Sequence, residues 1–192
     1  VVPVYNEGPR LLPTIEKIQE VLNSKYSSLD TEVIIVNDGS IDQTAFVLTQ
    51  LQSSRLKVVH HPVNRGYGAA LKSGILRASQ EWILITDADL TYPIDQANEL
   101  IQHADAFDMV VGARQGKFYH GSFLKRVLRV IFKFLVEFAT GNRIPDINSG
   151  FRFFRKKDVV PFFPTISPGF SFTTTTTLLY MLTNKSVKYV PV

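Results

Sequence analysis

The sequence contains no cysteine, which excludes disulfide bonds, thiolate zinc sites and a cysteine nucleophile. It has only four histidines, and none are paired at the HxH or HxxxH spacing that favours a histidine metal site. No apolar run reaches the length of about 18 residues that indicates a membrane-spanning helix, and no signal peptide is recognisable. The chain is therefore not expected to work through thiol, disulfide or histidine-metal chemistry.

Two common nucleotide-binding motifs are also missing. There is no GxGxxG with an acidic residue at the spacing that a dinucleotide ribose requires, which disfavours a Rossmann dehydrogenase. There is no GxxxxGK[ST] loop, so the chain is not a P-loop enzyme. No nucleic-acid-binding motif is present either.

The composition is that of a folded domain. Apolar residues make up 45% and charged residues 20% of the 192 residues, enough for a full core and unlike a disordered chain. We expect a single domain over residues 1–192. The sequence opens on VVPVY without Met and stops on KYVPV, which is typical of a piece of a longer protein.

Charge is divided unevenly along the chain. Up to Val110 there are 8 Lys and Arg against 14 Asp and Glu, whereas from Val111 onward there are 13 against 3. An acidic half suits cation coordination, and a basic half suits a phosphate or an anionic membrane surface. Within the chain we therefore expect residues 1–112 to suit a cation and residues 113–192 to suit a phosphate or an anionic membrane surface.

The first half alternates short apolar runs with helical patterns. Such alternation predicts an α/β fold with a central, mostly parallel sheet, in which ligands collect at the carboxyl ends of the strands. The expected strands are 1–4, 32–37, 56–60, 82–86 and 109–112, and the expected helices are 9–23, 42–53, 67–79 and 95–104.

Asp87-Ala88-Asp89 is the strongest local signal for chemistry. Two carboxylates flank a small residue directly after the predicted strand WILIT. Hard oxygen ligands suit Mg²⁺ or Mn²⁺, which would bridge a diphosphate. A lone DxD is more often a solvated turn, but other polar clusters follow strands that end at the same edge.

Two of these clusters have structural as well as functional interpretations. Asp38, in Val36-Asn37-Asp38-Gly39-Ser40, could cap a helix or turn, or bind a base edge or ribose. Asn64-Arg65-Gly66-Tyr67-Gly68 offers glycines for close backbone approach and an Arg for phosphate.

Residues 121–140 are expected to form a basic amphipathic helix. One stripe carries Arg126, Arg129 (or Val130), Lys133 and Glu137, opposite many Phe and Leu residues. Such a helix could lie in a membrane interface or could cover the sheet; its large apolar content favours the interface. The run Arg155-Lys156-Lys157 is interpreted either as a solvated surface or as a phosphate or membrane contact, with a slight preference for the contact.

Taken together, six segments resemble family 2 glycosyltransferases, closest to the dolichyl- or polyprenyl-phosphate mannosyl- or glucosyltransferase branch. They occur in the family order and cover nearly the whole chain. They are VVPVYNE (1–7), VNDGSIDQT (36–44), NRGYGAALKSGI (64–75), DADLTYP (87–93), VGAR (111–114) and DINSGFRFFRK (146–156). The resemblance implies the three-layer α/β GT-A fold, with a nucleotide-sugar-binding half over 1–112 and an acceptor- and membrane-facing half over 113–192.

The resemblance also implies roles for individual residues. Asp89 would ligate a divalent metal, with Asp87 and Thr91 beside it, although Thr91 stands where some relatives carry Gln. Asp89, Asp146 and Arg152 would serve catalysis, the last two near the reacting sugar and acceptor. The nucleotide sugar would be held by Pro3, Tyr5, Glu7, Val36, Asp38, Arg65, Asp87, Ala88 and Arg114.

The segment where relatives that glycosylate hydroxyls usually place an acidic base is SFTTTTTLLYML (171–182), which has no carboxylate. A hydroxyl must lose its proton as it attacks, whereas a phosphate monoester is already largely anionic at neutral pH. This favours a phosphate acceptor, with Asp146 and Asp158 left as alternative bases. The threonine run could equally be a strand edge or a helix cap without catalytic importance.

These observations predict an inverting transferase that moves a hexose from a GDP- or UDP-sugar to a polyprenyl phosphate, with Mg²⁺ or Mn²⁺. It would work on the cytoplasmic face of a membrane and would bind no nucleic acid. Three alternatives remain open: transfer to a sugar hydroxyl of a glycan, a non-catalytic nucleotide-sugar-binding module, and a nucleotidyltransferase, which would release pyrophosphate.

Overall fold

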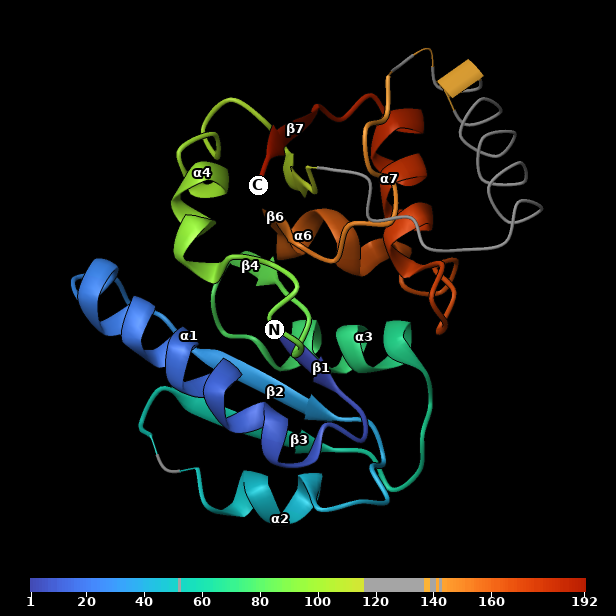
Figure 1. Ribbon diagram of the computed structural model, residues 1–192. Helices are drawn as coiled ribbons and strands as arrows, with labels where there is room; N and C mark the ends of the chain where they lie inside the picture. Colours follow the sequence, from blue (N-terminus) through green and yellow to red (C-terminus); the bar gives the residue numbers. More distant parts are fainter. Residues whose placement is uncertain (52, 116–136, 139–140, 142) are drawn as a thin grey trace.

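The computed structural model, drawn in Figure 1, describes residues 1–51, 53–115, 137–138, 141 and 143–192. The strands are β1 (Val2–Val4), β2 (Val33–Asn37), β3 (Leu56–His60), β4 (Trp82–Ile85), β5 (Met109–Ala113), β6 (Arg152–Arg155) and β7 (Val187–Pro191). The α-helices are α1 (Leu11–Lys25), α2 (Thr44–Thr49), α3 (Tyr67–Arg77), α4 (Ala97–Ile101), α6 (Lys156–Val159) and α7 (Phe172–Leu182), with 3₁₀ turns at Gly8–Arg10, Ile94–Gln96 and Val160–Phe162.

The strands form two sheets that meet at Val1. One has the order β1-β2-β3 and is entirely parallel; the other has the order β4-β6-β5-β7, in which β6 alone runs antiparallel. The amino group of Val1 donates to the Leu84 carbonyl over 2.7 Å, and the Thr86 N–H donates to the Val1 carbonyl over 3.2 Å. The expected mostly parallel α/β arrangement is confirmed.

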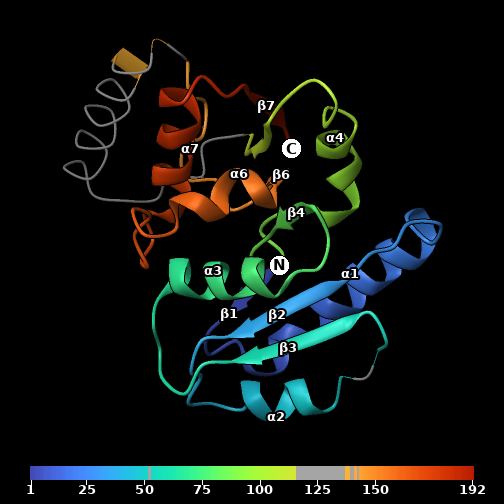
Figure 2. The same cartoon turned by 180° about the vertical axis from the view of Figure 1, so that it is seen from behind.

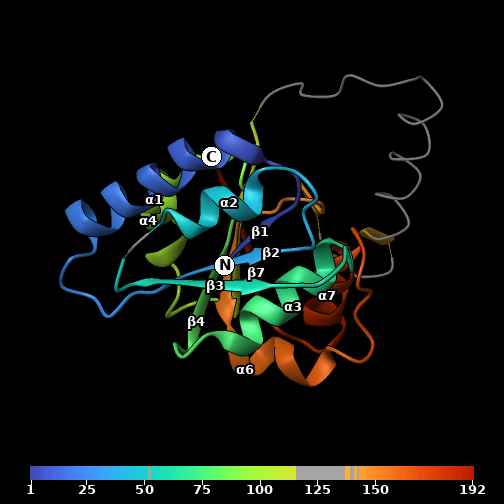
Figure 3. The ribbon, with the colours of Figure 1, turned by 90° about the horizontal axis from the view of Figure 1, so that it is seen from below.

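Helices cover both faces of the strands. Figure 3 shows α1, α2 and α4 on one side and α3, α6 and α7 on the other, and Figure 2 gives the view of Figure 1 from behind. Two hydrophobic cores correspond to these two faces. Both cores draw on residues before and after position 112, for example Val2 with Phe153 in one and Ile34 with Phe172 in the other.

Several predicted helices begin later or end earlier than expected. The predicted helix 9–23 is a 3₁₀ turn followed by α1, because Gly8 has a positive φ of 52° and Pro9 follows it. The predicted helix 42–53 begins only at Thr44, whose N–H is accepted by Oδ1 of Asp42 over 2.9 Å. The basic helix predicted over 121–140 lies almost wholly outside the described residues. No helix that the structure describes is long and apolar enough to cross a membrane.

The threonine run is neither a strand edge nor a helix cap. Thr173–Thr177 lies inside α7, where β-branched residues are ordinarily disfavoured. The Thr176 hydroxyl donates to the Phe172 carbonyl over 2.6 Å and the Thr177 hydroxyl to the Thr173 carbonyl over 3.0 Å. These bonds to the preceding turn satisfy the buried hydroxyls and make the run compatible with a helix.

The basic run Arg155-Lys156-Lys157, which begins with the last residue of β6, lies away from the strand ends that carry the predicted site. Arg155 pairs with Trp82 at the start of β4, and its guanidinium lies 4.7 Å from the Trp82 ring centre. Lys156 donates to the carbonyls of Leu76 and Ala78 at the end of α3, over 3.1 and 2.6 Å. Lys156 therefore caps a helix C-terminus, as cations commonly do, and a phosphate or membrane contact by this run stays a prediction.

Candidate active site

The carboxyl ends of β1 to β5 meet at one edge of the molecule because these strands run in the same direction. The antiparallel β6 begins at this edge, since Arg152 pairs with Ile85, the last residue of β4. The loop 146–150 therefore joins the polar segments that follow β1, β2, β4 and β5. The structure brings the predicted clusters together at this edge, as the sequence led us to expect.

Asp87 lies at the centre of this group. Its Oδ1 accepts a hydrogen bond from the Tyr67 hydroxyl over 2.9 Å. Burial raises the pKa of Asp87, and the negative charges of Asp89 and Glu7 raise it further, against the lowering effect of Tyr67 and Arg114. A carboxylate in these surroundings gains from a bound cation.

Asp89 is exposed and its carboxylate is oriented by the loop that follows. The N–H of Thr91 donates to its Oδ1 over 3.0 Å, and the intervening Leu90 has a positive φ of 58°. This is a strained conformation for a leucine, of the kind that persists where the surroundings impose it. Thr91 thus acts on Asp89 through its main chain.

The two carboxylates fit a divalent cation that binds together with a substrate. Within the described ranges no group of three or more His, Asp or Glu side chains could hold a metal without a substrate. Mg²⁺ commonly uses one or two carboxylates and completes its octahedron with phosphate oxygens and water. Asp87 and Asp89 would hold such an ion, and the cation would offset the like charge that raises the pKa of Asp87.

Glu7 and Tyr5 lie in the loop after β1. Burial raises the pKa of Glu7, and the negative charge of Asp89 raises it as well, so the two carboxylates influence each other. The N–H of Asn6 donates to the Ser40 hydroxyl over 3.0 Å, which ties this loop to the segment after β2. The Tyr5 side chain is 43% exposed, as a ring that stacks on a ligand would need to be.

Asp38 has a structural role that the sequence left undecided. Its carboxylate is buried and accepts bonds from Nδ1 of His61 at 2.6 Å, the Arg65 N–H at 3.0 Å and the Gly66 N–H at 2.8 Å. Nε2 of His61 in turn lies 2.8 Å from the Ser73 hydroxyl on α3. Asp38 therefore braces the loop that carries the exposed Arg65.

Three other residues expected at the nucleotide-sugar site belong to the framework. Pro3 and Val36 are buried register partners in β1 and β2, and Val36 packs in the core beneath α3. The carbonyl of the buried Ala88 accepts a bond from the Thr14 hydroxyl over 2.7 Å.

Gly66 and Gly68, in the segment after β3, allow the main chain of residues 167–169 to approach closely. A Cβ at Gly68 would lie 2.5 Å from the Ser167 carbonyl oxygen, and one at Gly66 would lie 2.8 Å from that of Pro168. The Pro168 carbonyl also accepts the Ala69 N–H over 2.8 Å. The expectation that these glycines admit a ligand is corrected, because the segment 167–169 covers them.

Arg114 and Asp146 form a two-pronged ion pair. Nε of Arg114 donates to Oδ2 over 2.8 Å and Nη2 donates to Oδ1 over 3.1 Å. The Asp146 side chain is buried, whereas that of Arg114 is one-third exposed, at 33%. The Arg114 guanidinium also lies 5.7 Å from the centre of the Tyr92 ring.

Arg152 is completely buried, at 0% exposure. Its guanidinium donates to the carbonyls of Ser149 and Ile147 and to the Thr177 hydroxyl, each over 2.7 Å. In this conformation Arg152 contacts the inner side of the loop 146–150. Asp158, the alternative base, follows the other end of β6 and accepts from Lys185 over 2.8 Å.

Three residues of the site had no role assigned from the sequence: Tyr67, Tyr92 and His61. Tyr67 and Tyr92 do lie inside the motifs NRGYG and DADLTYP. Tyr67 holds Asp87, and the Tyr92 hydroxyl accepts the Gly150 N–H over 2.7 Å. His61 gives no local signal, because its contact with Asp38 depends on the register of β2 against β3.

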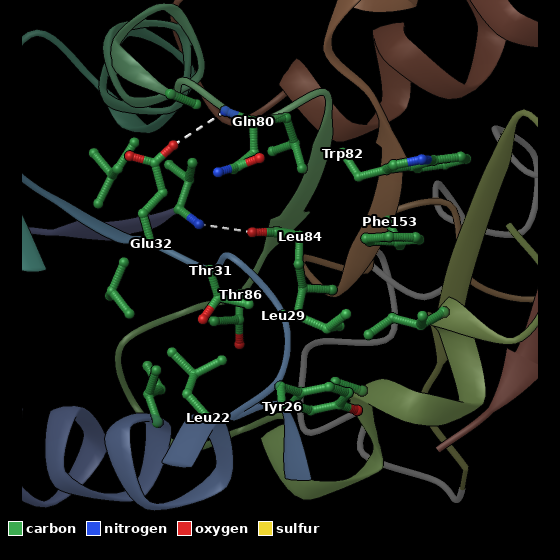
Figure 4. A pocket seen from close by; sticks show the side chains of 18 of the residues that line it. Leu22, Tyr26, Leu29, Thr31, Glu32, Gln80, Trp82, Leu84, Thr86 and Phe153 are labelled. Atoms are coloured by element: carbon green, nitrogen blue, oxygen red, sulfur yellow. Dashed lines mark hydrogen bonds between the residues drawn. The ribbon is translucent and has the colours of Figure 1, made fainter. Parts of the chain in front are cut away.

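A separate apolar cavity of about 520 Å³ lies between α1 and the start of β4 (Figure 4). Leu22 of α1 and Tyr26, directly after α1, line it on one side, and Trp82 and Leu84 line it from β4. The carboxylates of Asp87 and Asp89 are not among its lining residues. The polar cluster at the strand ends is therefore distinct from this cavity.

Comparison with known proteins gives a family match. The family model described as "Glycosyl transferase family 2" matches residues 1–160. A dolichyl-phosphate beta-glucosyltransferase of Trichomonas vaginalis is 31% identical over 179 residues, which cover 85% of this chain and 53% of that protein. A dolichyl-phosphate beta-glucosyltransferase of Dictyostelium discoideum is 30% identical over 183 residues, which cover 86% of this chain and 56% of that protein.

An undecaprenyl-phosphate 4-deoxy-4-formamido-L-arabinose transferase of Klebsiella pneumoniae is 29% identical over 163 residues, with 81% of this chain and 48% of that protein covered. The chain thus spans about half the length of the curated relatives it matches. Among solved structures, glucosyl-3-phosphoglycerate synthase from Mycobacterium tuberculosis, in complex with Mn²⁺, uridine diphosphate and phosphoglyceric acid, superposes with a TM-score of 0.74 at 19% identity. That match covers 99% of this chain and 66% of the other, and it shows a shared fold.

Proposed function

The chain belongs to glycosyl transferase family 2 and has the GT-A fold, and on this premise we propose that it transfers a hexose from a nucleotide sugar to a polyprenyl phosphate. The observation that carries the proposal is the strand-end cluster of Asp87, Asp89 and the Arg114–Asp146 pair. The relatives named for dolichyl-phosphate and undecaprenyl-phosphate transfer support the acceptor class.

The donor diphosphate would lie between the carboxylate pair and Arg114. Asp87 and Asp89 would hold Mg²⁺ or Mn²⁺, which when bound neutralises charge on the departing diphosphate. The neighbour that contains Mn²⁺ together with uridine diphosphate supports a divalent metal. Tyr5 and Glu7 on one side and the loop of Arg65 on the other would enclose the nucleoside of a GDP- or UDP-hexose.

In the reaction an acceptor phosphate oxygen would attack the anomeric carbon. The new carbon–oxygen bond forms as the bond from that carbon to the nucleoside diphosphate breaks, which inverts the configuration. Tyr67 would keep Asp87 oriented through its phenol, which stays protonated because burial and the negative charge of Asp87 raise its pKa. The Arg114 guanidinium would stabilise charge that develops on the leaving group.

The state of the two alternative bases supports a phosphate acceptor. Asp146 already accepts from Arg114 on both of its oxygens. Asp158 is paired with Lys185 beyond the other end of β6. A phosphate acceptor needs no base, because it is already largely ionised at neutral pH.

The two halves of the chain would bind different substrates. Residues 1–112, together with Arg114, would hold the donor, and the remainder of 113–192 would face the acceptor at the cytoplasmic surface of a membrane. The basic excess of the second half supports this arrangement, because anionic lipid surfaces attract Lys and Arg.

The test is transfer of labelled sugar from a panel of GDP- and UDP-hexoses to polyprenyl phosphate by the purified protein in detergent. Parallel reactions contain Mn²⁺, Mg²⁺ or a chelator, and the Asp89→Ala variant serves as the blank. A chelator-sensitive, organic-extractable product that mild acid releases would support a glycosyl phosphate lipid and identify the donor.

Other outcomes would replace the proposal. Consumption of the donor only when a glycan is added would assign a hydroxyl acceptor. Release of pyrophosphate would indicate a nucleotidyltransferase, and nucleotide binding without any turnover would indicate a binding module.

A further inference from the structure

The threonine run of α7 packs against the loop 146–150. Thr174 and Thr177 are buried, and their hydroxyls contact two different residues of this region. The Thr174 hydroxyl donates to Oδ1 of Asn148 over 3.0 Å, and the Thr177 hydroxyl accepts from Nη1 of Arg152 over 2.7 Å. The segment that lacks the carboxylate of hydroxyl-glycosylating relatives therefore still reaches the site region.

Arg152 is a buried cation held by neutral oxygens. In the part of the chain that the structure describes, no carboxylate lies at ion-pair distance from it. Its charge is stabilised by the two loop carbonyls and by the Thr177 hydroxyl. A fully buried guanidinium is costly, so each of these hydrogen bonds matters to its position.

The two carbonyls that Arg152 holds determine where two N–H groups point. In a trans peptide unit the C=O and the following N–H point in opposite directions. Because the Ile147 and Ser149 carbonyls face Arg152, the N–H groups of Asn148 and Gly150 face away from it. The Asn148 N–H contacts Oδ1 of Asp146 at 3.3 Å, and the Gly150 N–H donates to the Tyr92 hydroxyl over 2.7 Å.

Both of these contacts lead directly to the proposed reaction site. Asp146 is the carboxylate that holds Arg114. Gly150 lies against Asp87, since a Cβ on it would be 2.6 Å from Oδ2 of Asp87. A change in the orientation of the two peptide units would therefore move Arg114 and Asp87 together.

We infer that Arg152 and Thr177 are positioning residues, which act through the peptide units of the loop 146–150 and contact neither donor nor acceptor. Thr177 holds the guanidinium, the guanidinium holds the two carbonyls, and the opposed N–H groups orient Asp146 and Tyr92. This inference rests on the proposed function for its catalytic consequence, and it gives the threonine run a role other than that of a base.

The decisive comparison is between two neighbouring buried threonines. Thr177→Val removes the hydroxyl that accepts from Arg152, and Thr177→Ser keeps it. Thr176→Val is the matched control, because the Thr176 hydroxyl is equally buried but, among the described residues, bonds only to the Phe172 carbonyl within α7. We expect Thr177→Val to lower kcat about tenfold with the donor KM nearly unchanged, as for an interaction made in the transition state. Thr177→Ser and Thr176→Val should retain most of the turnover.

A second readout does not depend on activity. In ¹⁵N-labelled protein, Thr177→Val should shift the Arg152 Nε–Hε signal and the amide signals of Asn148 and Gly150, and Thr176→Val should leave all three in place. These spectra test the positioning role even if the wild-type protein shows no turnover, an outcome that would count against the proposed function alone.

Two results would overturn the inference. One is that Thr177→Val and Thr176→Val lose kcat equally and in parallel with a loss of thermal stability. This would indicate that both threonines only stabilise helix α7. The other is unchanged Asn148 and Gly150 signals in Thr177→Val.

Discussion

The hydroxyl of Tyr67, at the start of α3, donates to Oδ1 of Asp87, just beyond the end of β4, over 2.9 Å. Twenty positions separate the two residues in the chain, and the bond joins two of the motifs that follow different strands. The Tyr67 ring is also stacked on Phe170, with ring centres 5.9 Å apart. Tyr67 therefore connects the carboxylate of the site to the segment that covers the α3 N-terminus.

This bond predicts a change in the pH dependence of turnover. Burial raises the pKa of Asp87, whereas the Tyr67 bond lowers it, so Tyr67→Phe should raise that pKa further. Because Asp87 must be ionised to hold a cation, turnover should fall as the pH drops through its pKa, and in Tyr67→Phe this acid limb should move to higher pH. The measurement is kcat/KM against pH.

Tyr26→Phe is the control for this prediction, because it also removes a buried tyrosine hydroxyl but one that lines the apolar cavity. Its acid limb should match that of the wild type. If the acid limb of the pH profile does not shift in Tyr67→Phe, the Tyr67 phenol does not lower the pKa of Asp87.

Asp89→Ala should abolish metal-dependent turnover without unfolding the protein. Asp89 is exposed, and within the described part of the chain the hydrogen bond it loses is the one from the Thr91 N–H, so the effect on stability should stay within about 0.5 kcal/mol. Turnover measured with Mn²⁺ tests the loss of activity, and the midpoint of thermal unfolding tests whether the fold is intact. Asp105→Ala, which removes another exposed carboxylate, should behave as the wild type. Normal turnover by Asp89→Ala would refute the metal assignment.

Gly150→Ala should disable the site because its new Cβ would meet the carboxylate of Asp87. The approach would be 2.6 Å to Oδ2 and 2.7 Å to Oδ1, so either Asp87 or the loop must move. We expect a loss of turnover of at least about tenfold, which corresponds to about 1.4 kcal/mol of transition-state stabilisation. Gly169→Ala is the control, since its Cβ would find the nearest atom at 3.6 Å. Equal turnover in the two variants would contradict the predicted contact.

Glu32 makes the stability of the fold depend on pH. Burial alone would raise its pKa, but hydrogen bonds from Lys57, Ser79 and the Gln80 N–H bring it down to about 2. A carboxylate whose pKa is lower in the folded state than its ordinary value of 4.5 stabilises the fold fully at pH values above 4.5. This stabilisation is lost as the pH falls from 4.5 toward about 2. Glu32→Gln should therefore be less stable than the wild type at pH 7, and the difference should shrink across that window.

Urea unfolding at several pH values between 2 and 7 measures this dependence for both proteins, with Glu99→Gln as an exposed control. A difference between wild type and Glu32→Gln that does not change with pH would contradict the assignment.

Much of the framework could be predicted from local patterns. The β-branched run at β2 and the apolar run at β4 are each followed by polar residues, and the predicted strands agree with the observed ones to within one or two residues. Helix boundaries were less accurate. Asp42 delays the start of α2, and residues 94–104 divide into a 3₁₀ turn and the short α4, because local hydrogen bonds decide where a helix begins.

The roles of individual site residues were harder to predict. The sequence left Asp38 open between a cap and a base- or ribose-binding carboxylate, and only the register of β2 against β3 places His61 beside it. Arg152 looked like an acceptor-site cation, yet it is completely buried beneath its own loop. A motif identifies which side chains lie near a strand end, but not which way each of them points.

The sequence by itself determined the alternation of strands and helices, the edge at which the polar motifs gather, and the family. It could do so because strand and helix periodicity are local properties, and because parallel strands bring their carboxyl ends together. Only the tertiary structure decided that Tyr92 holds Gly150 across 58 positions and that Thr177 holds Arg152 across 25. Such hydrogen bonds need donor and acceptor placed to within a few tenths of an ångström, and that placement comes from the packing of segments that are distant in the chain.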